Sequence, residues 1–455
     1  MGIQSEAVRN RGSRSKVFGT IPSGLILVMT LAVAIRLLYV LPLNPTSLSW
    51  SDESRYDKIA WHLAETGRFE SSAYDAPPVL PGLLAIVYKV FGHNYRAART
   101  CQALLSAAFV LAMFQLADMF FDRRTAYLTA VGVAFYPQFI YLSSVLYAEH
   151  TYLLLMALTV LGLARWQKQG RLYQLIVAGL LMGLTALCRP VFLLFFPFAA
   201  VYVWWQASPK VKLRYSLTVC AVAAGTILPW TIRNAMVFHR FVPISTGFGT
   251  HLWRGNNDVA MGDTGDRLLT PLEALWKQRA QMLLTDAQRE KVTAQMEIFV
   301  QRLDQLDGVS RDRQMGAEAM RWIKAHPGKF LELVGRRFLT LYTAFSQLKE
   351  NAEVANERNS LIAAFSFYPV LAFGIAGMIL AARRYKASLL LHAVIASNLA
   401  AYLPMTACTR FRLPIDGYWI AFAAFAVVAA CDRLTRPAGE NLPPQPAIAD
   451  KPLST

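Results

Sequence analysis

The sequence predicts an all-α integral membrane protein. Hydrophobic residues make up 55% of its 455 residues and charged residues only 16%, which is too apolar for an ordinary soluble domain. Several apolar stretches approach the roughly 20 residues that a helix needs to cross about 30 Å of hydrocarbon. Open strands would leave backbone groups unpaired in lipid, and no alternating pattern of about ten residues indicates a barrel. Helices are therefore the expected spanning elements.

About ten apolar segments are expected to cross the bilayer: residues 22–41, 100–119, 126–142, 146–164, 172–188, 190–206, 215–231, 360–381, 388–404 and 417–431. We do not interpret the first as a cleaved signal peptide. Its apolar run is too long, and Leu41-Pro42-Leu43-Asn44 offers no small-residue cleavage site. Arg36 lies inside this segment and should face the bundle or extend to the boundary.

Basic residues orient these segments, because they precede the first one and then fill alternate connections. They are Arg9, Arg11, Arg14 and Lys16; Arg123 and Arg124; Arg165, Lys168 and Arg171; Lys210, Lys212 and Arg214; and Arg383, Arg384 and Lys386. The positive-inside rule places these residues and both termini in the cytoplasm. Much of the net charge of +17 falls in these connections, so it indicates a lipid bilayer rather than nucleic acid as the partner.

The chain is expected to divide into five parts. These are a cytoplasmic N-terminal segment (1–21), a transmembrane core (22–231) with a first extracytoplasmic loop (43–99), an extracytoplasmic helical loop domain (232–359), C-terminal transmembrane helices (360–431) and a disordered cytoplasmic tail (432–455). Within the loop domain, residues 329–345 form an amphipathic stretch. We expect it to lie in the membrane interface, since a further span would reverse the charge pattern that follows.

The first loop carries an acidic pair, Ser51-Asp52-Glu53, just after the first apolar segment. A helical face follows it in Tyr56, Ile59, Ala60, Leu63 and Ala64. In one interpretation Ser51 caps a helix, and the acids occupy its first turn, where the helix dipole favours them. In the other, the carboxylates abstract a proton at the boundary between lipid and water.

Further polar motifs fall on the same side of the expected topology. They are Glu149-His150, Arg189-Pro190, Pro229-Trp230-Thr231-Ile232-Arg233-Asn234 and Arg410-Phe411-Arg412-Leu413-Pro414. Singly they have simpler explanations, such as a helix cap, a snorkelling arginine or a buried structural histidine. On an extended segment, however, Arg410 and Arg412 would point the same way, as a phosphate clamp requires. Ionisable groups gathered on one membrane face favour a site.

The second loop opens with Gly247-Phe248-Gly249 and continues to Gly255-Asn256-Asn257. Its asparagine amides are of the kind that bind sugar hydroxyls, although composition alone favours an ordinary loop. No nucleotide-binding fingerprint occurs, so a transferase working outside the cytoplasm would need a lipid-linked donor. The five cysteines show no metal-ligand spacing.

In their order and topological positions, these residues resemble a known superfamily. The resemblance also draws on Ala76-Pro77-Pro78, Phe91-Gly92, Cys188-Arg189-Pro190 and Pro243-Ile244-Ser245-Thr246. Over residues 22–431 the chain is similar to bacterial glycosyltransferases of the GT-C superfamily. The branch in question holds the dolichyl-phosphate-mannose protein mannosyltransferases and the lipid A aminoarabinose transferases.

The resemblance implies transfer of a sugar from a polyprenyl-phosphate carrier to an acceptor hydroxyl outside the bacterial inner membrane. The acceptor would be a glycolipid, a cell-envelope glycan or a protein. It implies an inverting displacement with Asp52 or Glu53 as the base. The expected ligands of the donor phosphate are Arg189, Arg233, Arg410 and Arg412. The expected substrate cavity holds Tyr56, Glu149, His150, Asn256 and Asn257. Some relatives bind a divalent metal near these acids and others work without one, so the sequence leaves the metal open.

A transporter or flippase of lipid-linked sugars is the alternative. It would explain the number of spans and the arginines equally well. It predicts charges near the bilayer midplane and paired discontinuous helices. Here the acids lie at the boundary beside a long amphipathic loop, which favours the enzyme.

Overall fold

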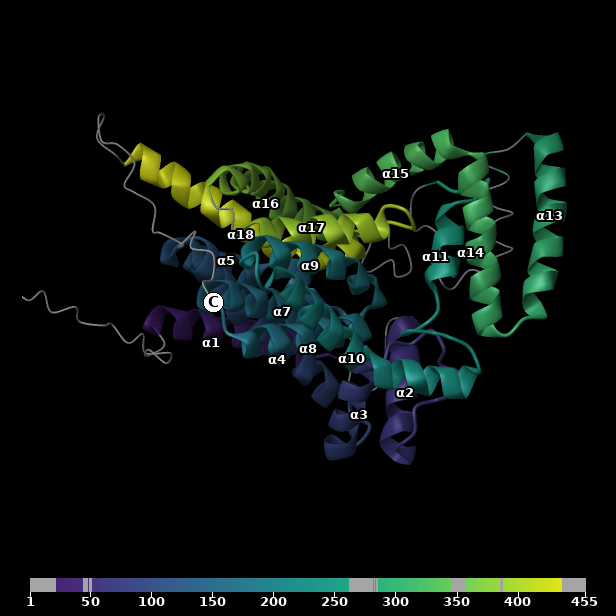
Figure 1. Ribbon diagram of the computed structural model, residues 1–455, viewed down its shortest axis with the longest axis horizontal. Helices are drawn as coiled ribbons and strands as arrows, with labels where there is room; N and C mark the ends of the chain where they lie inside the picture. Colours follow the sequence, from purple (N-terminus) through teal and green to yellow (C-terminus); the bar gives the residue numbers. More distant parts are fainter. Residues whose placement is uncertain are drawn as a thin grey trace, which may run out of the picture.

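The computed structural model describes residues 22–43, 48, 51–261, 281, 283, 285–344, 357–384 and 388–435. Every regular element in these ranges is a helix (Figure 1), so the expected all-α fold is confirmed. The N-terminal segment 1–21 and residues 436–455 of the tail lie outside the described residues, as does the side chain of Ser51 on which the expected cap depends.

Apolar helices make this a multi-pass membrane protein. Five described helices are long and apolar enough to cross a bilayer: α1 (Ser23–Val40), α4 (Tyr95–Phe120), α10 (Lys212–Phe238), α16 (Glu357–Arg384) and α18 (Thr409–Leu434). Shorter apolar helices are α3 (Val79–Phe91), α8 (Leu172–Cys188), η1 (Pro190–Leu194) with α9 (Phe195–Gln206), and α17 (Leu389–Tyr402). Between α4 and α8 lie α5 (Arg123–Phe135), α6 (Pro137–Leu142) and α7 (Glu149–Gln169). That about ten helices cross remains a prediction.

Local sequence signals set the helix ends that matter for the site. Asn94 caps α4 by accepting hydrogen bonds from the amides of Arg96 and Ala97, at 2.9 and 3.2 Å. Gly170 ends α7 in the left-handed conformation, with a φ of 68°, which glycine adopts without strain. At the end of α8, Arg189 is extended because a residue before proline is kept out of the helical region.

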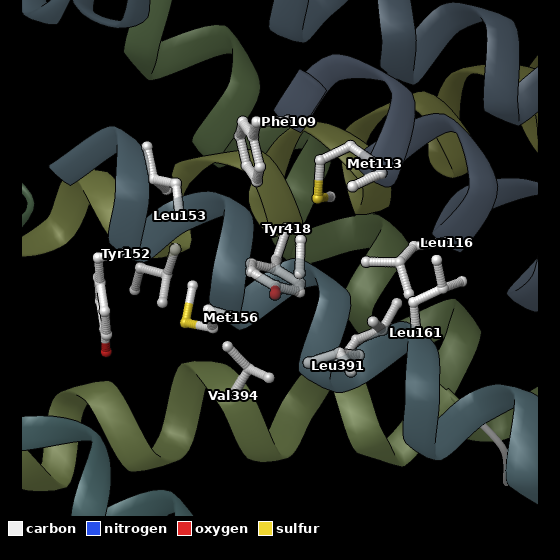
Figure 2. Packing of buried hydrophobic residues seen from close by; sticks show 14 of the residues in the cluster. Phe109, Met113, Leu116, Tyr152, Leu153, Met156, Leu161, Leu391, Val394 and Tyr418 are labelled. Atoms are coloured by element: carbon white, nitrogen blue, oxygen red, sulfur yellow. The ribbon is translucent and has the colours of Figure 1, made fainter. Parts of the chain in front are cut away.

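The core of the bundle lies between α4, α7, α17 and α18 (Figure 2). Its buried side chains include Phe109, Met113, Leu116, Tyr152, Leu153, Met156, Leu161, Leu391, Val394 and Tyr418. Helix α16 packs on α18 at Gly377, where a Cβ atom would overlap the carbonyl oxygen of Phe422. The close packing holds the middle of α18 against α16.

A second layer of helices lies at one end of the bundle (Figure 1). It contains α11 (Phe248–Gly255), α13 (Asp286–Asp304), α14 (Gly308–Ala325) and α15 (Pro327–Leu341). Its own core is formed by Leu252, Trp253, Val259, Met296, Leu303, Met315 and Ala319. The first loop supplies α2 (Ser51–Thr66), and the amide of Thr246 donates to the carbonyl of Tyr74 at 2.9 Å. A backbone hydrogen bond therefore joins the first loop to the second.

Helix α15 is amphipathic, as its sequence indicates. Leu333 and Leu341 are buried, whereas Leu331, Phe338 and Leu339 are exposed. The helix has 15 residues and is not among the helices long enough to span. Its position in the membrane interface remains a prediction.

The basic connection Arg123-Arg124 and the start of α18 lie at different ends of the bundle. Helix α18 begins at Thr409 and ends at Leu434, and near its end Asp432 forms an ion pair with Arg124 at 3.0 Å. The basic connection Arg123-Arg124 therefore lies at the opposite end of α18 from Arg410. This is the separation that the expected topology requires.

Candidate active site

Four of the residues singled out from the sequence form one network of charges. Arg410 Nη1 donates to Asp52 Oδ2 at 3.0 Å, and Arg410 Nε donates to Glu149 Oε1. Arg189 Nη2 donates to the same Glu149 oxygen at 2.6 Å. We call Asp52, Glu149, Arg189 and Arg410 the acid–arginine network. It joins two carboxylates and two guanidinium groups from four separate elements.

Helix ends bring these side chains together. Glu149 is the first residue of α7, Arg189 is the C-cap of α8, Arg410 is in the first turn of α18, and Asp52 is in the first turn of α2. Each lies at or next to the end of a helix, so four separate elements contribute to one cluster. The network therefore lies at the end of the bundle that faces the loop layer.

The network is largely enclosed. The side chains of Asp52, Glu149, Arg189 and Arg410 are 15%, 1%, 13% and 18% exposed. Hydrogen bonds between ionised groups are stronger than neutral ones, and low exposure limits their screening by solvent. Arg410 also lies 3.7 Å above the ring of Tyr147, an additional cation–π contact. These contacts hold both guanidinium groups at the same end of the bundle.

One oxygen of the network is unused. Glu149 Oε1 accepts from both arginines, but among the residues that the structure describes the buried Oε2 has no hydrogen-bond partner. A buried acceptor without a donor is costly, and such an atom in a native protein calls for an explanation. A hydroxyl group of a bound ligand would satisfy it.

Aromatic side chains border the network. Tyr402 on α17 accepts a hydrogen bond from Arg189 Nη1 at 3.4 Å. Tyr56 is buried on α2, and burial raises the pKa of its phenol; the nearby charge of Arg55 opposes that rise. The charges of Asp52, Arg189 and Arg410 also act on Tyr56. Tyr56 therefore lies beside the network, and its place in a substrate cavity stays a prediction.

Glu53 differs from its neighbour Asp52. Its side chain is buried, with 1% of the residue exposed, and its Oε1 accepts from the amide of Leu146 at 2.8 Å. That contact holds the segment that leads into Glu149. Of the two adjacent acids, Asp52 is the one in the acid–arginine network.

His150 follows Glu149 but faces elsewhere. Consecutive residues on a helix are about 100° apart, so they do not share a face. His150 is buried, and its Nε2 lies 3.4 Å from the hydroxyl oxygen of Ser143. The structure places it in the bundle rather than with the two arginines.

The expectation of an extended segment at Arg410-Phe411-Arg412 is wrong, because α18 already begins at Thr409. Two residues apart on a helix are about 200° apart, so the guanidinium groups point in different directions. Arg412 binds Asp416 at 2.9 Å and the carbonyls of Leu341 and Thr343 at 3.0 Å each. It joins α18 to the end of α15 and is 2% exposed.

Arg233 likewise has other partners. Its Nη2 donates to the carbonyls of Phe69 and Glu70, at 3.1 and 3.2 Å, and its guanidinium lies 4.9 Å from the ring of Trp230. The residue fixes the first loop onto the end of α10. The structure does not bring it to the acid–arginine network.

The side-chain amides of Asn256 and Asn257 also form hydrogen bonds within the protein. Asn256 Nδ2 donates to the carbonyls of Leu252 and Pro404, at 2.7 and 2.9 Å, and its oxygen accepts from Arg337. Asn257 Nδ2 donates to the carbonyl of Trp253 at 2.9 Å. Both residues are buried, and their bonds shape the end of α11. They fit a structural role better than contact with a sugar.

Two residues near Asp52 were missed from the sequence. Arg55 pairs with Asp75, and its spacing of three residues from Asp52 on a helix is a signal that could have found it. His251 on α11 carries no sequence signal. Burial, with a smaller effect of Arg254, lowers the pKa of His251 to about 4, although the charges of Asp312 and Asp52 oppose this. His251 therefore lies near enough to Asp52 for their charges to interact, and it is neutral near pH 7.

The residues at this site do not form a ready metal centre. In the part of the chain that the structure describes, no group of three His, Cys, Asp or Glu side chains is arranged to hold a metal ion. The two acids of the network are already joined by the guanidinium of Arg410. The donor set thus consists of two carboxylates with a cation between them.

Known proteins resemble the chain in both sequence and fold. A family model described as dolichyl-phosphate-mannose-protein mannosyltransferase matches residues 75–232, about a third of the chain. The apo oligosaccharyltransferase of Archaeoglobus fulgidus matches with a TM-score of 0.54 and 17% identity, over 91% of this chain and 51% of that one. The chain has a GT-C fold. No curated protein matches it.

Two other solved structures are similar. The oligosaccharyltransferase AglB from Archaeoglobus fulgidus, in complex with an inhibitory peptide and a dolichol-phosphate, matches with a TM-score of 0.54 and 16% identity, over 90% of this chain and 50% of that one. ArnT from Cupriavidus metallidurans, bound to undecaprenyl phosphate, has a TM-score of 0.43 and 16% identity, over 89% of this chain and 78% of that one. The chain thus spans about half the length of the oligosaccharyltransferase structures. The resemblance expected from the motifs is confirmed for the GT-C fold and, over residues 75–232, for the mannosyltransferase family.

Proposed function

We propose that this protein is a membrane glycosyltransferase that moves a sugar from a polyprenyl-phosphate carrier to an acceptor hydroxyl. The observation that carries the proposal is the acid–arginine network, in which Asp52 and Glu149 meet Arg189 and Arg410 at the end of the bundle. The family match covers Glu149 and Arg189, and a neighbour of similar fold is described in complex with a dolichol-phosphate. An acid for the acceptor and cations for a lipid phosphate are the groups that such a transfer requires.

In the proposed reaction, Asp52 accepts the proton of the acceptor hydroxyl as its oxygen bonds to the anomeric carbon. The bond from that carbon to the phosphate oxygen breaks, and the polyprenyl phosphate leaves with the electron pair. Guanidinium groups of Arg189 and Arg410 stabilise the charge that develops on the phosphate. One displacement of this kind inverts the anomeric configuration. Asp52 is favoured over Glu53 as the base because the Glu53 carboxylate is buried against the amide of Leu146.

Glu149 is proposed to bind the transferred sugar. Its buried Oε2 has no hydrogen-bond partner within the described part of the chain, and a sugar hydroxyl is a donor of suitable size and polarity. Tyr56, Tyr147 and Tyr402 border the network and form its aromatic surroundings. The acceptor would be a glycolipid, an envelope glycan or a protein.

We further propose that the protein lies in a bacterial inner membrane with this site on the extracytoplasmic side and both termini in the cytoplasm. The basic connection at Arg123-Arg124 lies at the opposite end of α18 from Arg410, which supports this orientation.

Transfer from a radiolabelled polyprenyl-phosphate sugar by the purified protein tests the proposal. Asp52→Asn should lower the transfer rate by about a hundredfold or more, since general-base catalysis contributes about 10²–10⁴. Glu65→Gln, an exposed acid at the far end of the same helix, is the matched control and should keep the wild-type rate. Retained turnover in a folded Asp52→Asn protein would overturn Asp52 as the base. Movement of the lipid-linked sugar between leaflets without transfer would instead support a flippase.

A further inference from the structure

The guanidinium group of Arg410 lies between the carboxylates of Asp52 and Glu149. It donates through Nη1 to Asp52 at 3.0 Å and through Nε to Glu149, so one cation contacts a carboxylate of the first loop and one of α7. Two carboxylates that converge from separate segments are otherwise a common way to bind Mg²⁺ or Mn²⁺. Here the point where they converge is filled by a side chain from α18.

The charges of the network already cancel. Asp52 and Glu149 contribute two negative charges, and Arg189 and Arg410 contribute two positive ones. A divalent cation added among these enclosed groups would leave an excess of two positive charges next to two guanidinium groups. At low exposure such repulsion is only weakly screened. The donor set therefore does not fit a resident divalent metal while Arg410 is in place.

We propose that Arg410 is a built-in replacement for a divalent metal ion: it occupies the metal position between Asp52 and Glu149 and makes the site metal-independent. This inference rests on the proposed function for its chemistry. Nε and Nη1 of Arg410 donate to the two carboxylates. The guanidinium group is planar, so these two bonds also fix the orientation of the third nitrogen, Nη2. It can therefore donate to a phosphate oxygen, as a metal would by coordination. Unlike a metal, the arginine cannot be removed by a chelator.

The same geometry predicts a gain of metal binding. In Arg410→Ala, the two carboxylates lose their shared cation and the network carries a net negative charge. Oxygen ligands with an excess of negative charge attract Mn²⁺. We therefore expect purified Arg410→Ala to bind Mn²⁺ at least about tenfold more tightly than the wild type.

Electron paramagnetic resonance of Mn²⁺ titrated into the purified full-length protein tests the inference without any sugar substrate. The wild type should show no tightly bound Mn²⁺, Arg410→Ala should acquire a site, and adding Asp52→Asn to that variant should remove it. Arg321→Ala, an exposed arginine on α14, is the matched control and should behave as wild type. Should Arg410→Ala not fold, Arg410→Gln removes the charge while keeping much of the side-chain volume, and the same gain is expected.

Transfer activity provides the second readout. The wild-type rate should change by less than about twofold in EDTA, whereas any residual activity of Arg410→Ala should rise on addition of Mn²⁺. Mn²⁺ binding by the wild type that is lost in Asp52→Asn, or wild-type activity that EDTA abolishes and Mn²⁺ restores, would overturn the inference. Absence of an acquired site in both Arg410 variants would overturn it as well. If the metal-binding results hold but no sugar is transferred, the proposed function fails and the metal assignment stands.

Discussion

At the scale of single residues, the two arginines of the network have different environments. Arg189 contacts Glu149 and Tyr402 only through its two terminal nitrogens, while Arg410 bridges both acids. Arg189 is therefore the cation most able to turn toward a phosphate without breaking the bridge between the acids. Steady-state kinetics of an Arg189 variant can therefore measure the contribution of this residue separately from that of Arg410.

We expect Arg189→Gln to lower kcat by about 10²–10³, the loss seen when one donor to a developing negative charge is removed. The KM for the polyprenyl-phosphate donor should rise as well, since the phosphate is already charged in the ground state. Steady-state kinetics with varied donor concentration measure both effects. Arg123→Gln, an exposed arginine at the opposite end of the bundle, is the control. A normal kcat in Arg189→Gln would exclude the residue from stabilising the leaving phosphate.

His251 predicts how stability depends on pH. Its pKa is about 4 in the folded protein, and an exposed histidine has a pKa of about 6.5. Between these values the unfolded chain binds more protons, so stability rises with pH and is lost as the pH falls from about 6.5 toward 4. The full difference corresponds to about 3 kcal/mol.

Thermal unfolding in detergent at a series of pH values tests this effect. The wild-type melting temperature should fall between about pH 6.5 and 4, and His251→Gln should show a smaller fall because it lacks the titrating group. An unchanged pH profile in His251→Gln would show that another group dominates.

The positions of some site residues could be predicted from the sequence, and those of others could not. The expected topology assigns Asp52, Glu149, Arg189 and Arg410 to one side together with Glu53, His150, Arg233 and Arg412, and the structure joins the first four. Arg412 was misplaced because its direction depends on whether α18 begins before or after Arg410, which the sequence pattern did not settle. Asn256 and Asn257 have the chemistry of sugar ligands, but their amides bind carbonyls of α11 and, for Asn256, of Pro404, and no local pattern predicts these contacts.

At the scale of elements, Arg412 and Asp416 connect α18 to the loop layer. Both are buried, and Tyr136 donates a further hydrogen bond to Asp416 at 2.9 Å. Arg412 also binds the carbonyls of Leu341 and Thr343 at the end of α15. The contact couples the start of α18, with Arg410, to the position of α15.

Arg412→Leu should therefore destabilise the protein by about 3–5 kcal/mol, because it leaves the Asp416 carboxylate buried without its cation. The double variant Arg412→Leu/Asp416→Leu should recover part of this loss, since the two effects are not additive for a contacting pair. Thermal unfolding measures the stability, and hydrogen exchange of α15 reports its docking. Equal stability of wild type and Arg412→Leu would show that the pair contributes little.

The helical fold was accessible from the sequence because hydropathy and charge report directly on the bilayer. The paths of the chain between helices were harder to predict. The link of Thr246 to Tyr74 and that of Arg233 to the carbonyls of Phe69 and Glu70 depend on contacts between loops that no local pattern encodes. The number of crossing helices also stays open, since several apolar helices are shorter than a full span.

At the scale of the whole molecule, the orientation makes a prediction of its own. In a background with the exposed Cys431 changed to Ser, Glu65→Cys should react with a membrane-impermeant maleimide added outside intact inner-membrane spheroplasts. Lys210→Cys, in the basic connection before α10, should react only after the membrane is permeabilised. The reverse pattern would place the site on the cytoplasmic side and contradict the use of an externally presented lipid carrier.

The central claim is that the acid–arginine network receives the phosphate of a lipid-linked donor. An experimental structure of the protein with a bound polyprenyl phosphate tests this most directly. The account predicts a phosphate oxygen within hydrogen-bonding distance of Arg189 or Arg410, with Asp52 facing the side from which an acceptor enters. A phosphate bound elsewhere, with both arginines still paired only to Asp52 and Glu149, would contradict it.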